Sequence, residues 1–377
     1  MPFKVSDTKS QHFKDIETLL AQLKVEERNT SRISISEFLK QDSRVWEDEF
    51  FGDKSHRVSF NDEGFKDFCQ LLGVSSSLLK EIRESGLSTQ VMNDRIPDRK
   101  YKLEEYDFVL DEKKQEVLGC VSNSYNDLSN QSFFNMLNEV PAFKLDDFEY
   151  SESYLINTKL TLRFLSKRYE AGKVRDEYGI GQDVSRIGVE FRNSMVGTSA
   201  ISAFVFIRRL VCLNGMTIVT GGERGRVYHR GKASTFEERL DRRIKPVVRK
   251  MHHYRTWIEK LMDIEFNPEK LVENGAIKAI YEVYPLSREE KFQRDRLVGR
   301  KIREYDIKRI SSLPDRLKNP ITNQIFHSPF RNNATMFDFV NIFTEEANNL
   351  VPRKRLEKEE IAGKLANWIY ENRKKFN

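Results

Sequence analysis

The chain has 377 residues, of which 38% are hydrophobic and 11% aromatic, and this composition excludes a largely disordered protein. Lys and Arg outnumber Asp and Glu by six, no apolar run reaches membrane-spanning length, and the first ten residues lack a signal-peptide core. Three cysteines, Cys69, Cys120 and Cys212, lie far apart among apolar neighbours, as reduced buried thiols do. We therefore expect a cytoplasmic protein that has no membrane partner.

The N-terminal region, residues 1–99, is predicted to be rich in helix. Apolar residues at steps of three and four indicate an amphipathic helix over 9–27, and 33–40 and 57–60 have the pattern of short strands. Helices are expected to follow over 59–74, ending at Gly73, and over 75–84.

The central region, residues 100–233, is predicted to form a mostly antiparallel sheet with hairpins. Two β-type runs around a charged turn indicate a hairpin over 106–122, and a helix over 131–139 is stopped by Pro141. Alternating apolar residues predict single strands over 154–166 and 186–193, and the nearly continuous apolar run at 200–215 predicts a central strand.

The C-terminal region, residues 234–377, is predicted to be helical and to pack on the sheet. From Thr235 apolar residues step by three or four, and Pro246 should kink this helix or split it in two. Further helices are expected over 270–284, 287–305, 334–350 and 355–373. The expected fold class is α+β.

The most informative feature is a cationic segment between Gly221 and Thr256. It carries eleven Lys and Arg against four acids, a local net charge of +7, whereas the whole chain carries only +6. Such local charge points to an anionic partner, because phosphates are bound by clustered cations. Tyr228 and His229 lie among these cations and could stack on unpaired bases. The alternatives are a solvated helix face whose arginines pair with Glu237, Glu238 and Asp241, a protein interface, or a site for small anions.

Arg208 and Arg209 close the apolar run. As neighbours on a strand they must point to opposite faces of the sheet. One of them could then meet the ligand while the other pairs with an acid, such as Glu190 on the neighbouring strand. Asn193, Gly197, Asn214 and Gly215 read as turn residues, since Asn and Gly tolerate positive φ.

No catalytic constellation stands out. The histidines show no metal-ligand spacing, and the GGERGR segment lacks the Gly-Lys-Ser/Thr ending of a nucleotide-binding loop. Asp183, Glu190 and Arg192 around one strand only faintly suggest a metal-dependent nuclease. We therefore expect no cofactor and no metal, and favour a binding protein over an enzyme.

Several segments resemble one family in the order in which that family carries them. These are VLGCVSNSYNDLSN (117–130), GVEFRNSMVGTSAISAF (188–204), RRLVCLNGM (208–216), YHRGKA (228–233) and ATMFDFVNIFTEEANN (334–349). The family is one of phage-, prophage- and plasmid-encoded proteins of unknown function, and the resemblance covers roughly residues 100–350. It implies a mobile-element setting without an established activity. Genes of this family lie beside recombination and antirestriction genes, and by analogy this setting suggests a relation to phage single-strand annealing proteins.

The leading hypothesis is a nucleic-acid-binding protein that orders single-stranded DNA for annealing during recombination or replication. Under this hypothesis the protein could also form a homo-oligomer. The second hypothesis is an anti-defence protein that binds a host protein through the same patch, and the third is a metal-dependent nuclease. The predicted nucleic-acid contacts are Arg208, Arg209, Arg224, Arg226, Tyr228, His229, Arg230, Lys232, Arg239, Arg242 and Arg243.

Overall fold

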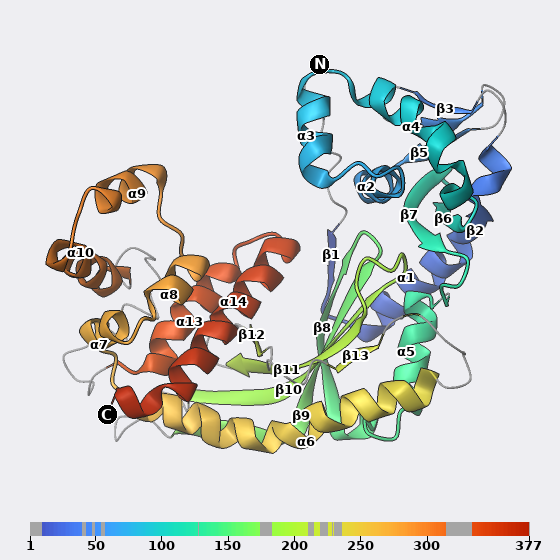
Figure 1. Ribbon diagram of the computed structural model, residues 1–377. Coiled ribbons are helices and arrows are strands. Elements are labelled where there is room, and N and C mark those ends of the chain that lie inside the picture. The colour runs from blue at the N-terminus through green and yellow to red at the C-terminus, as the bar shows by residue number, and fades with distance from the viewer. Residues whose placement is uncertain are drawn as a thin grey trace.

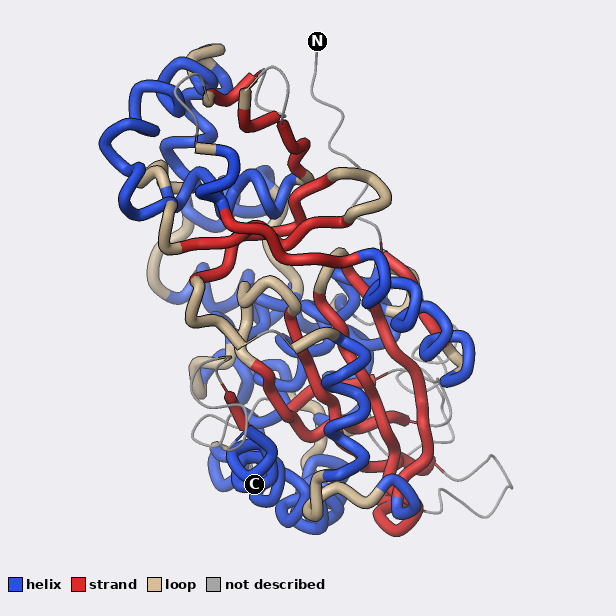
Figure 2. Tube along the Cα trace, turned by 90° about the vertical axis from the view of Figure 1, so that its right-hand side faces the viewer, coloured by secondary structure: helices blue, strands red, loops and turns tan. Residues whose placement is uncertain are grey.

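The computed structural model describes residues 10–39, 43–46, 50–53, 57–126, 128–173, 183–209, 215–218, 225–227, 229, 236–313 and 334–376. Two β-sheets and a set of helices make up this part of the chain, which confirms the expected α+β class. In Figure 1 the helices of the C-terminal half lie beside the larger sheet, and in Figure 2 its long strands run side by side in the lower part of the view.

The N-terminal region contains a sheet as well as helices. The order of its six strands is β2 (Thr30–Ser34), β6 (Tyr106–Asp111), β7 (Glu116–Ser122), β5 (Arg57–Phe60), β4 (Phe50–Gly52) and β3 (Arg44–Trp46). The predicted hairpin at 106–122 is present as β6 and β7, but it pairs within this smaller sheet and not within the central one. The strand expected over 33–40 ends at Ser34, where the chain turns into a 3-10 helix over Ile35–Phe38.

The helices of this region pack on the smaller sheet through a core of aromatic side chains. They are α2 (Asp62–Leu71), α3 (Ser76–Glu84) and α4 (Ser88–Leu103). Phe51, Phe65, Phe68 and Phe108 are all buried in one cluster. The helix predicted over 59–74 ends as expected, because Gly73 adopts a φ of +76° that other residues rarely reach.

The larger sheet is antiparallel throughout and supports the rest of the molecule. Its order is β1 (Ser10–Phe13), β8 (Phe148–Ile156), β9 (Lys159–Lys173), β10 (Asp183–Ser194), β11 (Ile201–Arg209) and β12 (Gly215–Ile218), with β13 (Gly225–Val227) also paired to β11. The prediction of one strand over 154–166 is wrong. The chain turns at Asn157, whose φ is +53°, so that this segment forms the hairpin between β8 and β9.

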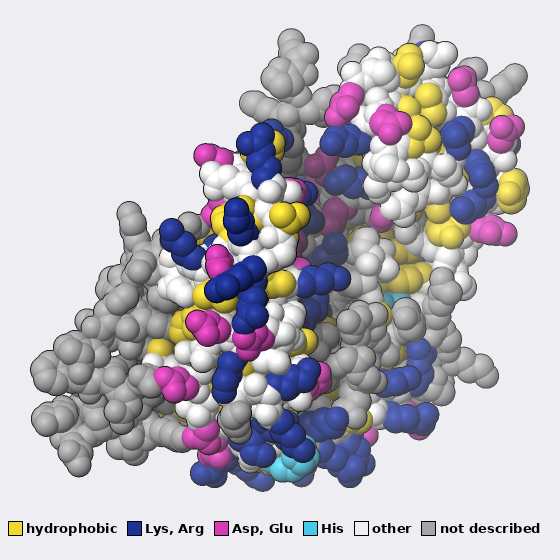
Figure 3. All heavy atoms as spheres, turned by 60° about the vertical axis from the view of Figure 1, so that its left-hand side comes forward, with side chains coloured by type: hydrophobic (Ala, Val, Ile, Leu, Met, Phe, Trp, Pro, Cys, Tyr) yellow, Lys and Arg dark blue, Asp and Glu magenta, His cyan; other side chains and the backbone are white. Residues whose placement is uncertain are grey.

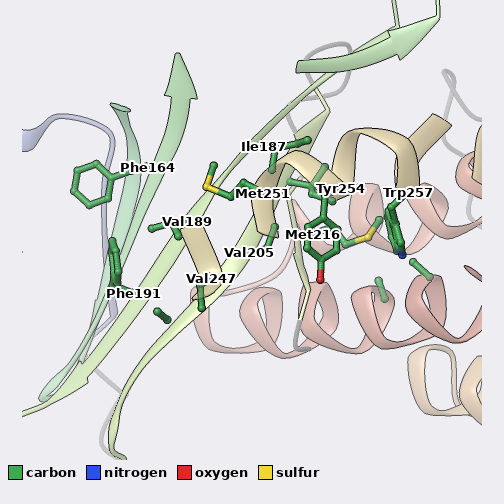
Figure 4. Packing of buried hydrophobic residues seen from close by; sticks show 14 of the residues in the cluster. Phe164, Ile187, Val189, Phe191, Val205, Met216, Val247, Met251, Tyr254 and Trp257 are labelled. Carbon is green, nitrogen blue, oxygen red and sulfur yellow. The ribbon is translucent and has the colours of Figure 1, made fainter. Parts of the chain in front are cut away.

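One long helix, α6 (Phe236–Asp263), crosses a face of this sheet (Figure 1). Its apolar stripe packs on side chains of β9, β10 and β11, and Figure 4 shows Val247 and Met251 beside Val189 and Val205. Of the two expected effects of Pro246, a kink or a split, the split does not occur, because α6 is continuous over 28 residues with Pro246 on its exposed side.

The remaining helices pack on the sheets or on one another. They are α1 (Ile16–Asn29), α5 (Asn130–Glu139), α7 (Pro268–Glu273), α8 (Ile277–Val283), α9 (Arg288–Asp295), α10 (Arg300–Ser311), α13 (Met336–Ala347) and α14 (Pro352–Glu371). The helix expected over 287–305 is divided into α9 and α10 near Gly299, which has a φ of +58°. Within the described ranges, no helix has both the length and the apolar character that crossing a bilayer requires.

Candidate nucleic-acid interface

The exposed side of α6 carries a run of positive charge without an acid. Between Arg242 and Arg255 the helix has six Lys and Arg and two histidines, and no Asp or Glu. The apolar stripe of the helix is buried against the sheet, so that the cations face outward on a fixed support. Figure 3 shows Lys and Arg side chains gathered at the lower edge of the molecule, where α6 runs in Figure 1.

Four of these cations have no acid partner in the part of the chain that the structure describes. Arg242, Arg243, Lys245 and Arg249 are exposed, and none of them forms an ion pair with any residue that the structure describes. One acid at the start of the helix has a different partner, since the Asp241 carboxylate accepts a hydrogen bond of 2.7 Å from the backbone N–H of Ala142. For Arg242, Arg243 and Arg249, the described part of the structure therefore does not contain the pairing with Glu237, Glu238 and Asp241 that the alternative requires.

Three of the cations form a row along a surface groove. Arg242, Lys245 and Arg249, the α6 row, follow one another at steps of three and four residues, which places them on one side of the helix over about 10 Å of its length. The groove has a volume of about 650 Å³, and it is also lined by Glu139 and Pro141 at the end of α5 and by Glu237, Glu238 and Asp241 at the start of α6. Lys245 and Arg249 are not among the contacts predicted from the sequence, although the helical spacing that predicts α6 also connects them to Arg242.

Arg209, a predicted contact, lies in the interior of the protein. Only 3% of this residue is exposed, its guanidinium lies 3.1 Å from the Asp338 carboxylate of α13, and it stacks over Phe337. The same carboxylate caps the start of α13 by accepting from the backbone N–H of Thr335. The expectation that one arginine of the pair would bind an acid is met by Arg209, but the acid is Asp338 and not Glu190.

Arg208 points to the face of the sheet opposite α6. Its neighbour Ile207 belongs to the core beneath α6, and consecutive residues of a strand face opposite sides. The Arg208 guanidinium donates a hydrogen bond of 2.5 Å to the hydroxyl of Ser151 on β8. Arg208, a predicted contact, therefore does not share a surface with the cations of α6, because the sheet separates them.

His229 is also in the interior, which corrects its prediction as a base-stacking residue. Only 3% of the residue is exposed, and its ring stacks on Tyr125 with the centroids 4.9 Å apart. Neither ring nitrogen has a hydrogen-bond partner in the part of the chain that the structure describes. Burial lowers the pKa of His229 to about 4, so that the imidazole is neutral at physiological pH.

The other predicted contacts divide into two groups. Arg226 lies in β13 opposite Ser202, and Arg239 is half-buried in the first turns of α6 with its guanidinium over the Phe236 ring. Arg224, Tyr228, Arg230 and Lys232, as well as Asn214 and Cys212, lie outside the described residues. Of the predicted contacts, Arg242 and Arg243 are the ones that the structure places on an open surface beside further cations.

On the opposite face of the sheet, arginines and glutamates form a buried ion network. At its centre is Arg163, fully buried, which donates hydrogen bonds of 2.9 Å to Glu152, 2.8 Å to Glu190 and 2.5 Å to Glu359. Three strands, β8, β9 and β10, are thereby joined to α14. Arg355 and Arg192 supply two more guanidinium groups to the same carboxylates.

The ion network engages Glu190, which belongs to the faintly suggested nuclease site. Burial opposes ionisation of Glu152, but the hydrogen bond from His12 and the charges of Arg163, Arg355 and Arg208 outweigh it and hold its pKa far below the usual range. Glu190, one of the two acids of the suggested site, is fully buried and engaged by Arg163 and Arg192. Its carboxylate is thus neutralised by protein cations, and the described residues contain no group of three potential metal ligands.

A family model matches most of the chain. A model described as a domain of unknown function, DUF932, matches residues 117–368. The chain belongs to the DUF932 family. No curated protein and no solved structure matches it significantly. The DUF932 match includes the larger sheet from β8 onward, α6 with its groove, and the α14 end of the ion network, whereas most of the smaller sheet precedes it.

Proposed function

We propose that this DUF932 protein binds nucleic acid, with a preference for single-stranded DNA, through the exposed side of α6. The observation that carries the proposal is the set of four exposed cations, Arg242, Arg243, Lys245 and Arg249, that have no acid partner within the described chain. Cations that a fold does not use internally are available to an external anion, and a nucleic-acid backbone is an anion with closely spaced charges.

The proposed mechanism is charge neutralisation on a preorganised surface. Each phosphate that meets a Lys or Arg releases condensed counterions, and this release favours binding at low salt. Because α6 is fixed by its buried stripe, the α6 row keeps its spacing without the ligand, which lowers the entropy lost on binding. The strand is held and ordered, and no bond is broken.

The proposal also includes the biological process in which the protein acts. The resemblance to phage- and plasmid-encoded proteins suggests a role in recombination or replication, in which ordered strands anneal. Annealing along one continuous track would require several copies of the chain side by side, so that homo-oligomerisation is part of this proposal.

The test is a titration of labelled oligonucleotides by fluorescence anisotropy across a salt series. The variant combines Arg242→Ala, Lys245→Ala and Arg249→Ala. If these three side chains each meet a phosphate, the slope of log affinity against log salt should become shallower by about 2, since each contact on a single strand contributes about 0.7.

The matched control removes three exposed arginines that do have acid partners. Arg300→Ala, Arg303→Ala and Arg353→Ala remove the partners of Glu304, Glu273 and Glu357, with the same loss of positive charge. We expect this control to retain most of the salt dependence. Equal weakening by both variants would show that only net charge matters, and an absence of binding to any oligonucleotide at low salt would reject the proposal in favour of a host-protein partner.

A further inference from the structure

The α6 row ends in a pair of histidines. His252 and His253 follow Arg249 at steps of three and four residues, the same steps that connect Arg242, Lys245 and Arg249. Both histidines are exposed. They therefore continue the row on the same side of the helix, about 5 Å beyond its last arginine. In Figure 3 a group of histidine side chains at the lower edge lies among Lys and Arg side chains.

The two rings form a compact aromatic surface. Their centroids are 3.9 Å apart with 37° between the ring planes. The Nδ1 of His252 donates a hydrogen bond to the backbone carbonyl of Arg249 one turn earlier, which holds the ring against the helix. A ring held in this way loses little further freedom when another flat group stacks on it.

Neighbouring charges favour an anionic strand at this position. Arg249 precedes the pair, Arg255 follows it, and the first acid after the pair is Glu259, which forms an ion pair of 3.1 Å with Arg255. A backbone that leaves the α6 row at Arg249 would thus reach the histidine rings without passing an acid of α6. Exposed rings on a helix can reach the flat face of a base only when that base is unpaired, since a duplex hides the faces within its own stack.

We infer that His252 and His253 form a stacking platform for an unpaired base at the end of the α6 row. This inference rests on the proposed function, and it specifies the ligand as a single strand that carries bases. It also replaces His229, whose ring is covered by Tyr125, as the aromatic contact of the interface. The arginines and the lysine recognise the backbone, and the histidines recognise the base.

The test separates bases from phosphates. Full-length protein is titrated with labelled oligothymidylate and with an abasic deoxyribose-phosphate oligomer of the same length and charge. Base stacking contributes enough that wild type should bind oligothymidylate at least about five-fold more tightly than the abasic strand. The variant with His252→Ala and His253→Ala should lose this preference and keep the salt dependence.

Two further variants identify the cause. His252→Phe with His253→Phe retains flat rings and removes the charge that imidazole can carry, and it should keep the preference for bases. Thr256→Ala, a change at the next exposed position of the same side, should leave both affinities unchanged. Circular dichroism of each variant checks that α6 is intact.

The unfavourable outcomes are distinct from one another. Equal wild-type affinity for the two strands, or an unchanged preference in the double alanine variant, overturns the stacking platform while the charged row stands. Loss of the preference in the double phenylalanine variant also overturns it, because a flat ring would then not suffice. If wild type binds neither strand at low salt, the proposed function and the platform both fail.

Discussion

The ion network around Arg163 and the outer side of α6 use the same residue types in opposite ways. In the network, each buried guanidinium meets two or more carboxylates at hydrogen-bond distance. On α6, four exposed cations have no acid partner among the described residues. The two surfaces lie on opposite faces of one sheet, which α6 covers on one side and α14 on the other.

This difference separates structural charge from available charge. A buried ion loses its hydration, and the protein must replace it with partners of opposite sign. An exposed ion keeps its water and costs the fold little, so that the stability of the protein does not require the four exposed cations of α6 that have no acid partner among the described residues. The presence of partners, more than the number of arginines, therefore indicates which cations can serve an external ligand.

The largest expected effect comes from the centre of the network. Arg163→Met would leave Glu152, Glu190 and Glu359 buried without their shared cation, and removal of one member of a buried ion pair costs about 3–5 kcal/mol. We expect the free energy of unfolding, measured by urea denaturation, to fall by about this amount. A loss below about 1 kcal/mol would break the comparison, because the network would then be no more structural than a surface pair.

His229 should reveal a smaller effect that depends on pH. The pKa of its ring is about 4 in the folded protein, whereas an unfolded histidine titrates near 6.5. Above that pH both states are neutral. As the pH falls from about 6.5 towards 4, the unfolded chain takes up a proton that the folded chain resists, and up to about 3 kcal/mol of stability is lost.

The variant His229→Phe checks the cause, since it retains a ring against Tyr125 and cannot titrate. Its free energy of unfolding should lack the decline between pH 6.5 and 4 that wild type shows. The same change should cost little at pH 7.5, because neither ring nitrogen has a partner to lose among the described residues. Identical pH profiles for the two proteins would contradict the buried, neutral state of His229.

Glu26 should make the stability of the protein depend on pH in the opposite direction to His229. It is a partly buried carboxyl on α1 whose hydrogen-bond donor is the neutral amide of Asn130, and burial, with the nearby charge of Asp111, raises its pKa to about 7. A raised pKa contributes stability that is fully present below about pH 4.5 and lost as the pH rises through 7. Glu26→Gln should therefore be more stable than wild type at pH 8 by about 1–2 kcal/mol, after allowance for its partial solvent contact, and equally stable at pH 4.

Features that depend on residues close together in the sequence could be predicted from the sequence alone. Features that depend on residues far apart in the sequence could not. The stripe of α6 and the spacing of its cations are local and were predictable from helical periodicity. Arg163 alternates with apolar residues, a pattern that predicts an exposed side chain. It is buried because Glu359, 196 residues later, covers it from α14. Asp338, 129 residues after Arg209, buries that arginine in the same way.

Such long-range contacts explain both the successes and the errors. A strand pattern shows that two residues face opposite sides, but it does not show which side a later helix will cover. The predicted interface therefore kept its helical members, Arg242 and Arg243, and lost its strand and loop members, Arg209 and His229, to the interior.

The smallest expected effect tests the outer side of α6. Arg249→Ala removes an exposed cation that pairs with none of the described residues, and alanine is a better helix former than arginine, so that the free energy of unfolding should change by less than about 0.5 kcal/mol. The measurement is urea denaturation under the conditions used for Arg163→Met. A loss of 2 kcal/mol or more, on the order of a buried interaction, would show that Arg249 has a structural role, and its value as a ligand contact would then need independent support. A near-zero change in the free energy of unfolding, combined with weaker oligonucleotide binding, would show that the two faces of the sheet have different roles. Arg163 would then stabilise the fold, and Arg249 would contribute only to ligand binding.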